Sequence, residues 1–338
     1  MTQLAEKKKP LIILTGPTAV GKTAASIGLA KAIGGEIISA DSMQVYRHMD
    51  IGSAKIMPEE MDGVKHHLID VLEPEAEFNV AVFQKMAKEA MEGIYERGNI
   101  PIVVGGTGFY IQALLYDIDF EKGEENTEYR RKLEIYAKEQ GVQALHDRLR
   151  EVDSKSADAI HANNVKRVIR ALEYYHETGM QISEHNETER EKKSPYQFAY
   201  FVLNDVRSHL YERIDQRVDL MVEQGLVEEV AALKARGCTR EMVSMQGLGY
   251  KEILDYLDGT ISLGEAVYII KRDTRHFAKR QLTWFKRERD VRFIAMDDRN
   301  APWVKLPDGT GQPEDDQQKI LTYICNDYFG GRNKHGIE

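Results

Sequence analysis

Short apolar runs alternate with longer amphipathic segments along most of the chain. Four of the runs have the length and composition of strands: Leu11–Leu14, Glu36–Ala40, Ile100–Val104 and Phe198–Leu203. The first is followed by a glycine-framed loop and a helical segment, and the third by a glycine turn and an apolar helix. This order predicts an α/β fold in which helices flank a parallel sheet.

Three longer segments show helical periodicity. They are Phe78–Arg97, Leu210–Ala235 and Ala266–Glu288, and we expect a helix in each. The last carries an apolar stripe that polar Thr274 and Gln281 interrupt.

The character of the chain changes near residue 120. A polar link at 121–126 precedes a highly charged helical stretch, which predicts an insertion that can move relative to the core. We therefore expect three parts: a core of residues 1–120 and 196–315, a helical insertion at 121–195 and a C-terminal tail at 316–338.

Composition narrows the class of protein. With 42% hydrophobic and 30% charged residues, the 338-residue chain has the composition of a soluble globular protein with material for a sizeable core. Its net charge of −9 means that any contact with nucleic acid needs a local basic surface. Cys238 and Cys325 form neither a zinc pattern nor a disulfide framework, and we find no targeting or membrane segment. We expect a cytoplasmic protein without membrane contact.

The clearest chemical signal is the loop after the first strand. It fits the spacing G-x-x-x-x-G-K-[ST], in which backbone N–H groups and a helix N-terminus face one anion. The lysine adds a point charge for phosphate oxygens, and the last hydroxyl, Thr23, suits Mg²⁺. An accidental glycine-rich turn is the weaker alternative, because a strand and a helix flank the loop. The predicted diphosphate-binding residues are Gly16, Pro17, Thr18, Ala19, Val20, Gly21, Lys22 and Thr23.

Two further polar positions follow predicted strands. Asp41 comes directly after Glu36–Ala40, and Thr107 lies among three glycines after Ile100–Val104. Ligands of open α/β sheets bind at the carboxyl ends of strands, so both residues are expected near Lys22. A capping role for Asp41 is the structural alternative. The neighbouring His66 and His67 lack a third metal ligand, and we expect a structural or substrate-contact role for them.

Cations are concentrated in two helical segments. Lys166 and Arg170 lie one turn apart on the same face, and Ala266–Glu288 is the most basic segment of this acidic chain. Such a helix can pack one side on the core and present cations to phosphates. For the first segment, an ordinary solvated helix face is favoured on charge alone.

Several of these stretches together resemble the bacterial tRNA dimethylallyltransferases, also called tRNA isopentenyltransferases. The resemblance extends in order from residue 16 to residue 284. The matching stretches are Gly16–Thr23, Asp41–Tyr46 with Asp50–Lys55, His66–Asp70, Gly105–Leu114, Arg167–Glu173, Gly247–Glu252 and Thr274–Trp284.

The resemblance implies a fold and a reaction. The fold is a P-loop NTPase-like parallel sheet with an inserted all-helical domain that grips the anticodon stem-loop. The reaction transfers a dimethylallyl group from dimethylallyl diphosphate, with Mg²⁺, to the N6 amine of an adenosine in tRNA. That adenosine follows the anticodon in tRNAs that read codons beginning with U. We expect the enzyme to be a monomer.

The resemblance also assigns roles by position. Asp41 matches the family's general base, Thr107 a threonine at the reacting region that touches tRNA, and Arg217 an arginine that contacts the diphosphate. Ser42, Met43 and Gln44 would line a pocket for the flipped base. The other expected tRNA contacts are Lys166, Arg167, Val168, Ile169, Arg170, Gly247, Gly249, Tyr250, Lys251, Arg275, Lys279 and Arg280.

Two other functions fit parts of the sequence. The phosphate loop and Asp41 would suit a small-molecule kinase, and incidental ATP binding at this loop is open. An RNA-binding NTPase switch fits less well, because no clear apolar run ends in the Asp that nucleotide hydrolysis requires. The basic helices and the second glycine loop favour a nucleic-acid acceptor and a prenyl donor.

Overall fold

The computed structural model describes residues 8–120 and 127–295 of the chain. The predicted polar link at 121–126 and the predicted tail at 316–338 lie outside these residues, as does 296–315 of the predicted core.

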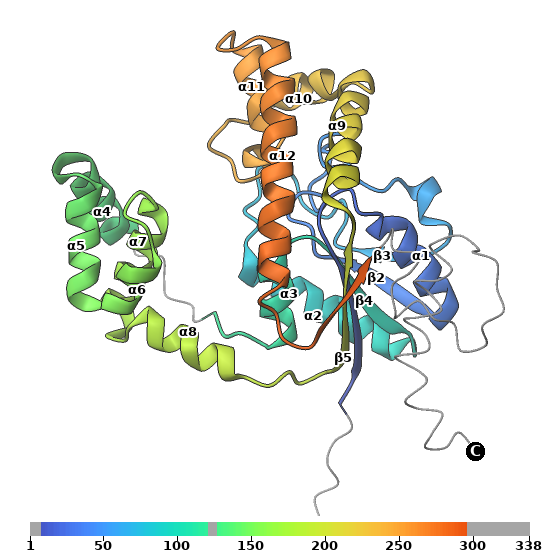
Figure 1. Cartoon of the computed structure of the whole chain (residues 1–338), viewed down its shortest axis with the longest axis horizontal. Helices are drawn as coiled ribbons and strands as arrows, with labels where there is room; N and C mark the ends of the chain where they lie inside the picture. Colours follow the sequence, from blue (N-terminus) through green and yellow to red (C-terminus); the bar gives the residue numbers. More distant parts are fainter. Residues whose placement is uncertain (1–7, 121–126, 296–338) are drawn as a thin grey trace, which may run out of the picture. The chain divides into compact units, whose positions relative to one another are not determined.

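The chain forms two compact units. The larger unit joins the residues up to Leu115 with those from Pro195 onward, and the smaller unit spans Tyr116–Ser194. In sequence, the smaller unit is therefore inserted into the larger one, between its fourth and fifth strands (Figure 1).

A parallel sheet forms the centre of the larger unit, which confirms the predicted fold class. Its order is β3-β2-β4-β1-β5-β6, so the central strand β1 pairs with β4 on one side and β5 on the other. The strands within the described residues are β1 (Pro10–Thr15), β2 (Gly35–Ser39), β3 (His66–His67), β4 (Ile100–Gly105), β5 (Gln197–Asn204) and β6 (Val291–Ala295).

Branched and aromatic side chains of these strands build the core. Ile12, Leu14, Ile102 and Phe201 have no exposed surface, and they pack with Leu29 from the first helix. Such continuous burial is what a parallel strand covered on both faces requires. The apolar runs therefore identified the main strands correctly.

Helices flank this sheet. Asn79 caps α2 by accepting hydrogen bonds of 3.1 Å from the N–H groups of Ala81 and Val82. The helices of the larger unit are α1 (Lys22–Ile33), α2 (Val80–Glu96), α3 (Gly108–Leu115), α9 (Arg207–Glu223), α10 (Leu226–Ala235), α11 (Tyr250–Leu257) and α12 (Leu263–Phe285), with 3₁₀ turns η1 (Pro58–Met61) and η2 (Ser244–Gln246).

Two sequence expectations differ from the structure. The amphipathic segment Leu210–Ala235 contains two helices, because Gly225 adopts a left-handed conformation with φ of 103° between α9 and α10. The polar pair His66 and His67 forms the edge strand β3, which pairs with Ile37 and Ile38 of β2. Because this segment is polar, the search for apolar runs did not identify it as a strand.

A buried carboxylate joins β2, β3 and the α2–β4 connection. Glu36 accepts two hydrogen bonds of 2.7 Å from Arg97 and one of 2.8 Å from Asn99. His67 Nε2 lies 2.7 Å from the same carboxylate. These partners, Arg97 foremost, lower the pKa of Glu36 to about 2. His67 thus has a structural role, one of the two that the sequence left open.

The smaller unit is helical throughout its described elements. Leu145, Leu149 and Leu172 lie in its hydrophobic core, and Arg130 donates two hydrogen bonds of 2.9 Å to buried Glu173. Its helices are α4 (Thr127–Gln140), α5 (Val142–Val152), α6 (Ser154–Ala159), α7 (Val165–Thr178) and α8 (Ile182–Glu191).

Among the described helices of both units, none is sufficiently long and apolar to cross a lipid bilayer.

Candidate active site

The phosphate loop connects β1 to α1, as the motif predicted. Gly16 has a φ of 150° and lies so close to the Leu203 carbonyl of β5 that a Cβ would overlap it. Ala19 and Val20 are buried, so their backbone rather than their side chains faces a ligand. Thr23 is exposed in the first turn of α1. The loop therefore has the geometry of an anion site at a helix N-terminus.

Lys22 bends back over this loop. Its ammonium donates hydrogen bonds to the carbonyls of Pro17 at 2.8 Å and Gly16 at 3.0 Å. Loss of hydration lowers its pKa to about 8, against the opposing effect of the Asp41 carboxylate, and the charge of Arg217 lowers it further. Asp41 and Arg217 are thus both close enough to affect the pKa of Lys22.

Asp41 follows β2 and forms a tight local turn. One oxygen, Oδ1, accepts hydrogen bonds from the N–H groups of Met43 at 2.8 Å and Gln44 at 3.4 Å. This is the capping role that the sequence left open as an alternative. We find no hydrogen bond from a described residue to the other oxygen, Oδ2, which leaves it available for a substrate. Ser42, Met43 and Gln44 are half-buried beside it.

The second glycine loop lies directly beside Asp41. The N–H of Thr107 donates a hydrogen bond of 3.3 Å to the carbonyl of Ala40. Gly105 is packed so tightly against Ala40 that a side chain there would overlap its backbone. At the strand level, the Thr15 hydroxyl donates to the Gly105 carbonyl at 2.5 Å. The structure therefore brings the ends of β1, β2 and β4 together, with Lys22, Asp41 and Thr107 around them.

Helix α9 contributes two arginines to this edge. Arg213 donates a hydrogen bond of 2.9 Å to the carbonyl of Ala19 in the phosphate loop, and it also pairs with Asp205. Arg217 lies one turn farther, and loss of hydration followed by the charge of Arg213 lowers its pKa. Sequence reasoning selected Arg217 but missed Arg213. The one-turn spacing of the two arginines was the available signal.

Helix α12 reaches both loops through a residue that the sequence analysis did not select. The side chain of Gln281 is buried and hydrogen-bonds to Thr18 of the phosphate loop and Gly106 of the second loop, at 3.0 Å each. Its only sequence signal was a polar residue in an apolar stripe.

The cations of α12 divide into two groups. Arg275 forms hydrogen bonds of 2.5 and 2.7 Å to Asp215, and Lys271 pairs with Asp219, so both connect α12 to α9. Asp215 already neutralises the charge of Arg275, and its contact with tRNA stays a prediction. Lys279 and Arg280 are exposed, and no carboxylate of the described chain pairs with either.

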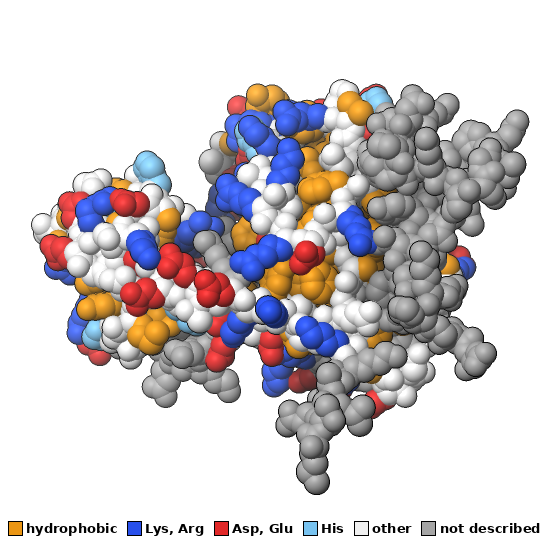
Figure 2. Space-filling view, turned by 60° about the horizontal axis from the view of Figure 1, so that its bottom comes forward, with side chains coloured by type: hydrophobic (Ala, Val, Ile, Leu, Met, Phe, Trp, Pro, Cys, Tyr) orange, Lys and Arg blue, Asp and Glu red, His pale blue; other side chains and the backbone are white. Residues whose placement is uncertain are grey.

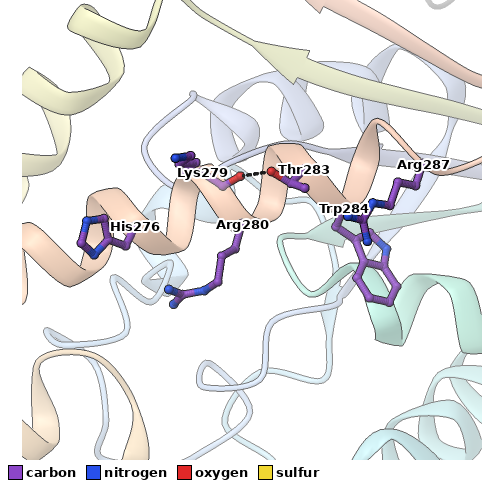
Figure 3. A pocket seen from close by; sticks show the side chains of 6 residues that line it. All are labelled: His276, Lys279, Arg280, Thr283, Trp284 and Arg287. Carbon is purple, nitrogen blue, oxygen red and sulfur yellow. Dashed lines mark hydrogen bonds between the residues drawn. The ribbon is translucent and has the colours of Figure 1, made fainter. Parts of the chain in front are cut away.

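These exposed cations line a surface pocket formed by α12 and by Arg287, which lies just after the helix. Figure 3 shows its six side chains spread along the end of the helix and the residue beyond it, with Arg287 beside the indole of Trp284. Cations beside an aromatic ring are typical of nucleic-acid surfaces. Figure 2 shows that Lys and Arg predominate over Asp and Glu on the described face of the larger unit turned to the viewer. The pocket residues are His276, Lys279, Arg280, Thr283, Trp284 and Arg287.

In the smaller unit, helix α7 separates the predicted contacts into two faces. Lys166, Arg167 and Arg170 are exposed, and no carboxylate of the described chain pairs with any of them. Val168 and Ile169 are 0% and 3% exposed and lie in the hydrophobic core. The side chains of these two residues therefore face the core and not the solvent, and a tRNA contact at these positions stays a prediction.

The turn before α11 supports the loop that follows Asp41. Gly247 packs against Met43, and Tyr250 is buried with its hydroxyl donating to Glu229 at 2.9 Å. The side chain of Tyr250 lies in the core, and a tRNA contact at this position stays a prediction. Gly249, with φ of 98°, and half-buried Lys251 flank it.

Glu229 extends this support to the chain after the turn. Its carboxylate accepts hydrogen bonds of 2.7 to 3.0 Å from three consecutive N–H groups, those of Asp50, Ile51 and Gly52. Buried Lys55 donates to the Tyr46 carbonyl at 2.7 Å and to Asp50 at 2.6 Å. The segment that carries Asp41 is thus anchored by charge-assisted hydrogen bonds.

The protein groups fit Mg²⁺ only in part. The described residues contain no cluster of three His, Cys, Asp or Glu side chains that could hold a metal. Thr23 offers one exposed hydroxyl beside the phosphate loop. A hydroxyl together with substrate phosphate oxygens and water is a common way to bind this ion.

Comparison with known proteins gives a consistent result. The chain matches the family model "IPP transferase" over residues 44–288 and "Isopentenyl transferase" over residues 9–78. The tRNA dimethylallyltransferase of Lachnoclostridium phytofermentans is 62% identical over 293 residues, 87% of this chain and 94% of that protein. The protein of the same name from Carboxydothermus hydrogenoformans is 52% identical over 284 residues, 84% of this chain and 91% of its own length.

Solved structures agree with these relatives. The tRNA isopentenylpyrophosphate transferase of Bacillus halodurans superposes with a TM-score of 0.69 at 44% identity, over 97% of this chain and 100% of that one. A eukaryotic dimethylallyltransferase acting on tRNA superposes with a TM-score of 0.77 at 29% identity, over 96% of this chain and 80% of that one.

Proposed function

The chain belongs to the tRNA dimethylallyltransferase family, and we propose on that premise that it transfers a dimethylallyl group from dimethylallyl diphosphate to an adenosine of tRNA. The acceptor is the N6 amine of the adenosine that follows the anticodon, in tRNAs reading codons that begin with U. One observation carries the proposal: a phosphate loop, Asp41 and Thr107 meet at neighbouring strand ends.

The diphosphate of the donor binds at the phosphate loop. Lys22 and Arg217 offset the negative charge that builds up on the leaving diphosphate, and backbone N–H groups of the loop add to this. When bound beside Thr23, Mg²⁺ supplies further charge neutralisation. The same loop could also admit ATP, which the experiment below addresses.

Asp41 acts on the acceptor. N6 attacks the allylic carbon of the donor while the C–O bond to the diphosphate breaks, and the diphosphate leaves with the electron pair. The N6 proton passes to Asp41, whose Oδ1 remains engaged with Met43 and Gln44. Thr107 lies close enough to position the reacting groups.

The tRNA binds through exposed cations. Lys279 and Arg280 in the larger unit and Lys166, Arg167 and Arg170 in the smaller unit contact the phosphates of the anticodon stem-loop. The adenosine leaves the base stack to reach Asp41, as bases must when an enzyme reacts with them. Ser42, Met43 and Gln44 line its pocket. A monomer in the cytoplasm remains our prediction.

The test uses unmodified tRNA and labelled dimethylallyl diphosphate without any nucleotide. We expect label in the tRNA and free diphosphate in equal amounts. A parallel incubation with labelled ATP tests phosphoryl transfer. Transfer that requires ATP turnover, or phosphorylation of a small molecule in place of prenylation, would contradict the proposal.

A further inference from the structure

Gln281 joins the two loops of the site through one buried amide. The N–H of Thr18 donates to its Oε1 at 3.0 Å, and its Nε2 donates to the Gly106 carbonyl at 3.0 Å. The side chain is only 6% exposed. Gly106 lies so close to Nε2 that a side chain at Gly106 would overlap it.

The amide of Gln281 satisfies both partners. Thr18 presents a donor and Gly106 an acceptor, and the planar amide offers one of each at a fixed separation. A carboxylate at this position would lack the donor, and an aliphatic side chain would lack both groups. Since the site is buried, an unpaired group here would lose the hydration that an exposed loop keeps.

The two bonds also determine which N–H groups face the diphosphate. Because Gln281 occupies the N–H of Thr18, a bound diphosphate relies on later N–H groups of the loop. Gly106 directly precedes Thr107, which is anchored to Ala40 beside Asp41. Gln281 thus connects the donor side of the site with the acceptor side.

Trp284 strengthens the same connection one turn farther along α12. Its indole lies against Gly108, where a Cβ would overlap the ring, and Phe109 stacks edge-on to it at 6.2 Å. One face of α12 therefore holds both loops, while Lys279 on another face is exposed.

We propose that Gln281 is a positioning residue that fixes the distance between the diphosphate loop and the Thr107 loop. The inference rests on the proposed prenyl transfer. By holding the donor carbon and Asp41 at the separation that transfer requires, Gln281 contributes to kcat without touching either substrate.

Two variants test this role. Gln281→Met keeps the approximate volume but removes both hydrogen bonds, and we expect kcat to fall about 10²-fold at every pH, the usual cost of misplacement by about 1 Å. Gln281→Glu keeps the acceptor and loses the donor. At pH 8 we expect a similar loss.

In the glutamate variant, the pH dependence of kcat distinguishes a positioning role from a merely structural one. Burial and the facing carbonyl favour its protonated form, which can donate to Gly106. We therefore expect the ratio of its kcat to that of the wild type to rise at least tenfold between pH 8 and pH 6. Gln216→Glu, the same change at an exposed position of α9, should keep a ratio near one.

Two outcomes would overturn the proposal: wild-type kcat in Gln281→Met, or a kcat ratio of Gln281→Glu that is low and equal at both pH values. Circular dichroism and tRNA affinity show whether each variant is folded. The comparison between pH 8 and pH 6 uses Gln281→Glu alone, so it remains valid even if Gln281→Met does not fold. Failure of the wild type to transfer the prenyl group would instead count against the proposed function.

Discussion

The ammonium of Lys22 donates a hydrogen bond of 2.8 Å to the carbonyl of Pro17, a residue of the same loop. A diphosphate entering the loop must therefore draw the lysine away from backbone carbonyls as well as bind it. The charge of the lysine matters for this step, and its pKa of about 8 means that this charge is lost as the pH rises through about 8.

We expect kcat/KM for the prenyl donor to fall as pH rises above about 8. A lowered pKa means that Lys22 becomes neutral in the free enzyme on the alkaline side, where it no longer attracts the diphosphate. At saturating donor, kcat should fall at a higher pH, because the bound anion favours the charged lysine. Initial rates between pH 6 and pH 10 provide the measurement. A profile of kcat/KM that stays flat to pH 10 would show that this charge does not limit donor capture.

Asp41→Asn separates the two roles of this residue. Asparagine can still accept hydrogen bonds from Met43 and Gln44, but it cannot take the N6 proton. We expect kcat to fall about 10²- to 10⁴-fold, with the thermal midpoint and tRNA affinity close to those of the wild type. Steady-state kinetics and a melting curve decide the matter. If kcat were unchanged, capping alone would explain Asp41.

The Glu36 cluster should make stability depend on pH. Its folded-state pKa of about 2 lies below the ordinary 4.5, so its contribution is present above pH 4.5 and is lost as pH falls toward 2. With Arg97 partly exposed, we expect Glu36→Gln to lower the free energy of unfolding at pH 7 by about 2 to 3 kcal/mol.

Urea unfolding at pH 7 and pH 3 measures this difference. The deficit of Glu36→Gln should shrink at pH 3, because the wild type has lost part of the same stabilisation. Glu89→Gln, an exposed carboxylate on α2, should change the free energy of unfolding little at either pH. An equal deficit of Glu36→Gln at both pH values would exclude the ionised carboxylate as its cause.

Lys279→Ala and Lys271→Ala form a matched pair on α12. Lys279 is exposed and carries an unneutralised charge, whereas Lys271 is 2.7 Å from Asp219. We expect Lys279→Ala to weaken tRNA binding and to reduce the slope of log K against log salt by about 0.7 to 0.9. Lys271→Ala should leave that slope unchanged. Equal slopes for Lys279→Ala and the wild type would show that this face of α12 is an ordinary solvated surface that does not contact tRNA.

Local sequence patterns correctly predicted the features that depend on neighbouring residues. The apolar runs identified the strands, and the glycine-lysine spacing predicted the loop between β1 and α1. Sequence patterns did not predict contacts between residues that lie far apart in the chain. The charge of Arg275 is neutralised by Asp215, 60 residues away, and the bonds of Gln281 reach back to Thr18 and Gly106. No window of neighbouring residues contains such partners.

Other features that the sequence did not predict depend on local backbone geometry and on which face of an element is buried. In α7, Lys166 and Arg167 are neighbours of buried Val168 and Ile169, so a sequence motif and a helix face do not coincide. Gly225 interrupts an amphipathic pattern that continues on both sides of it, and only its left-handed φ reveals the break. The two histidines of β3 form an edge strand that needs little apolar surface.

The pairing of β1 with β5 also has a consequence for biosynthesis. During translation, β1 emerges before its partner β5, which begins only at Gln197, after the whole smaller unit. The contacts of α4 to α8 are local and can form sooner, whereas the distant pairing is slow. A nascent chain that ends before Gln197 leaves one edge of β1 open and Gly16 without Leu203 beneath it. The phosphate loop is thus translated well before the strand that completes it.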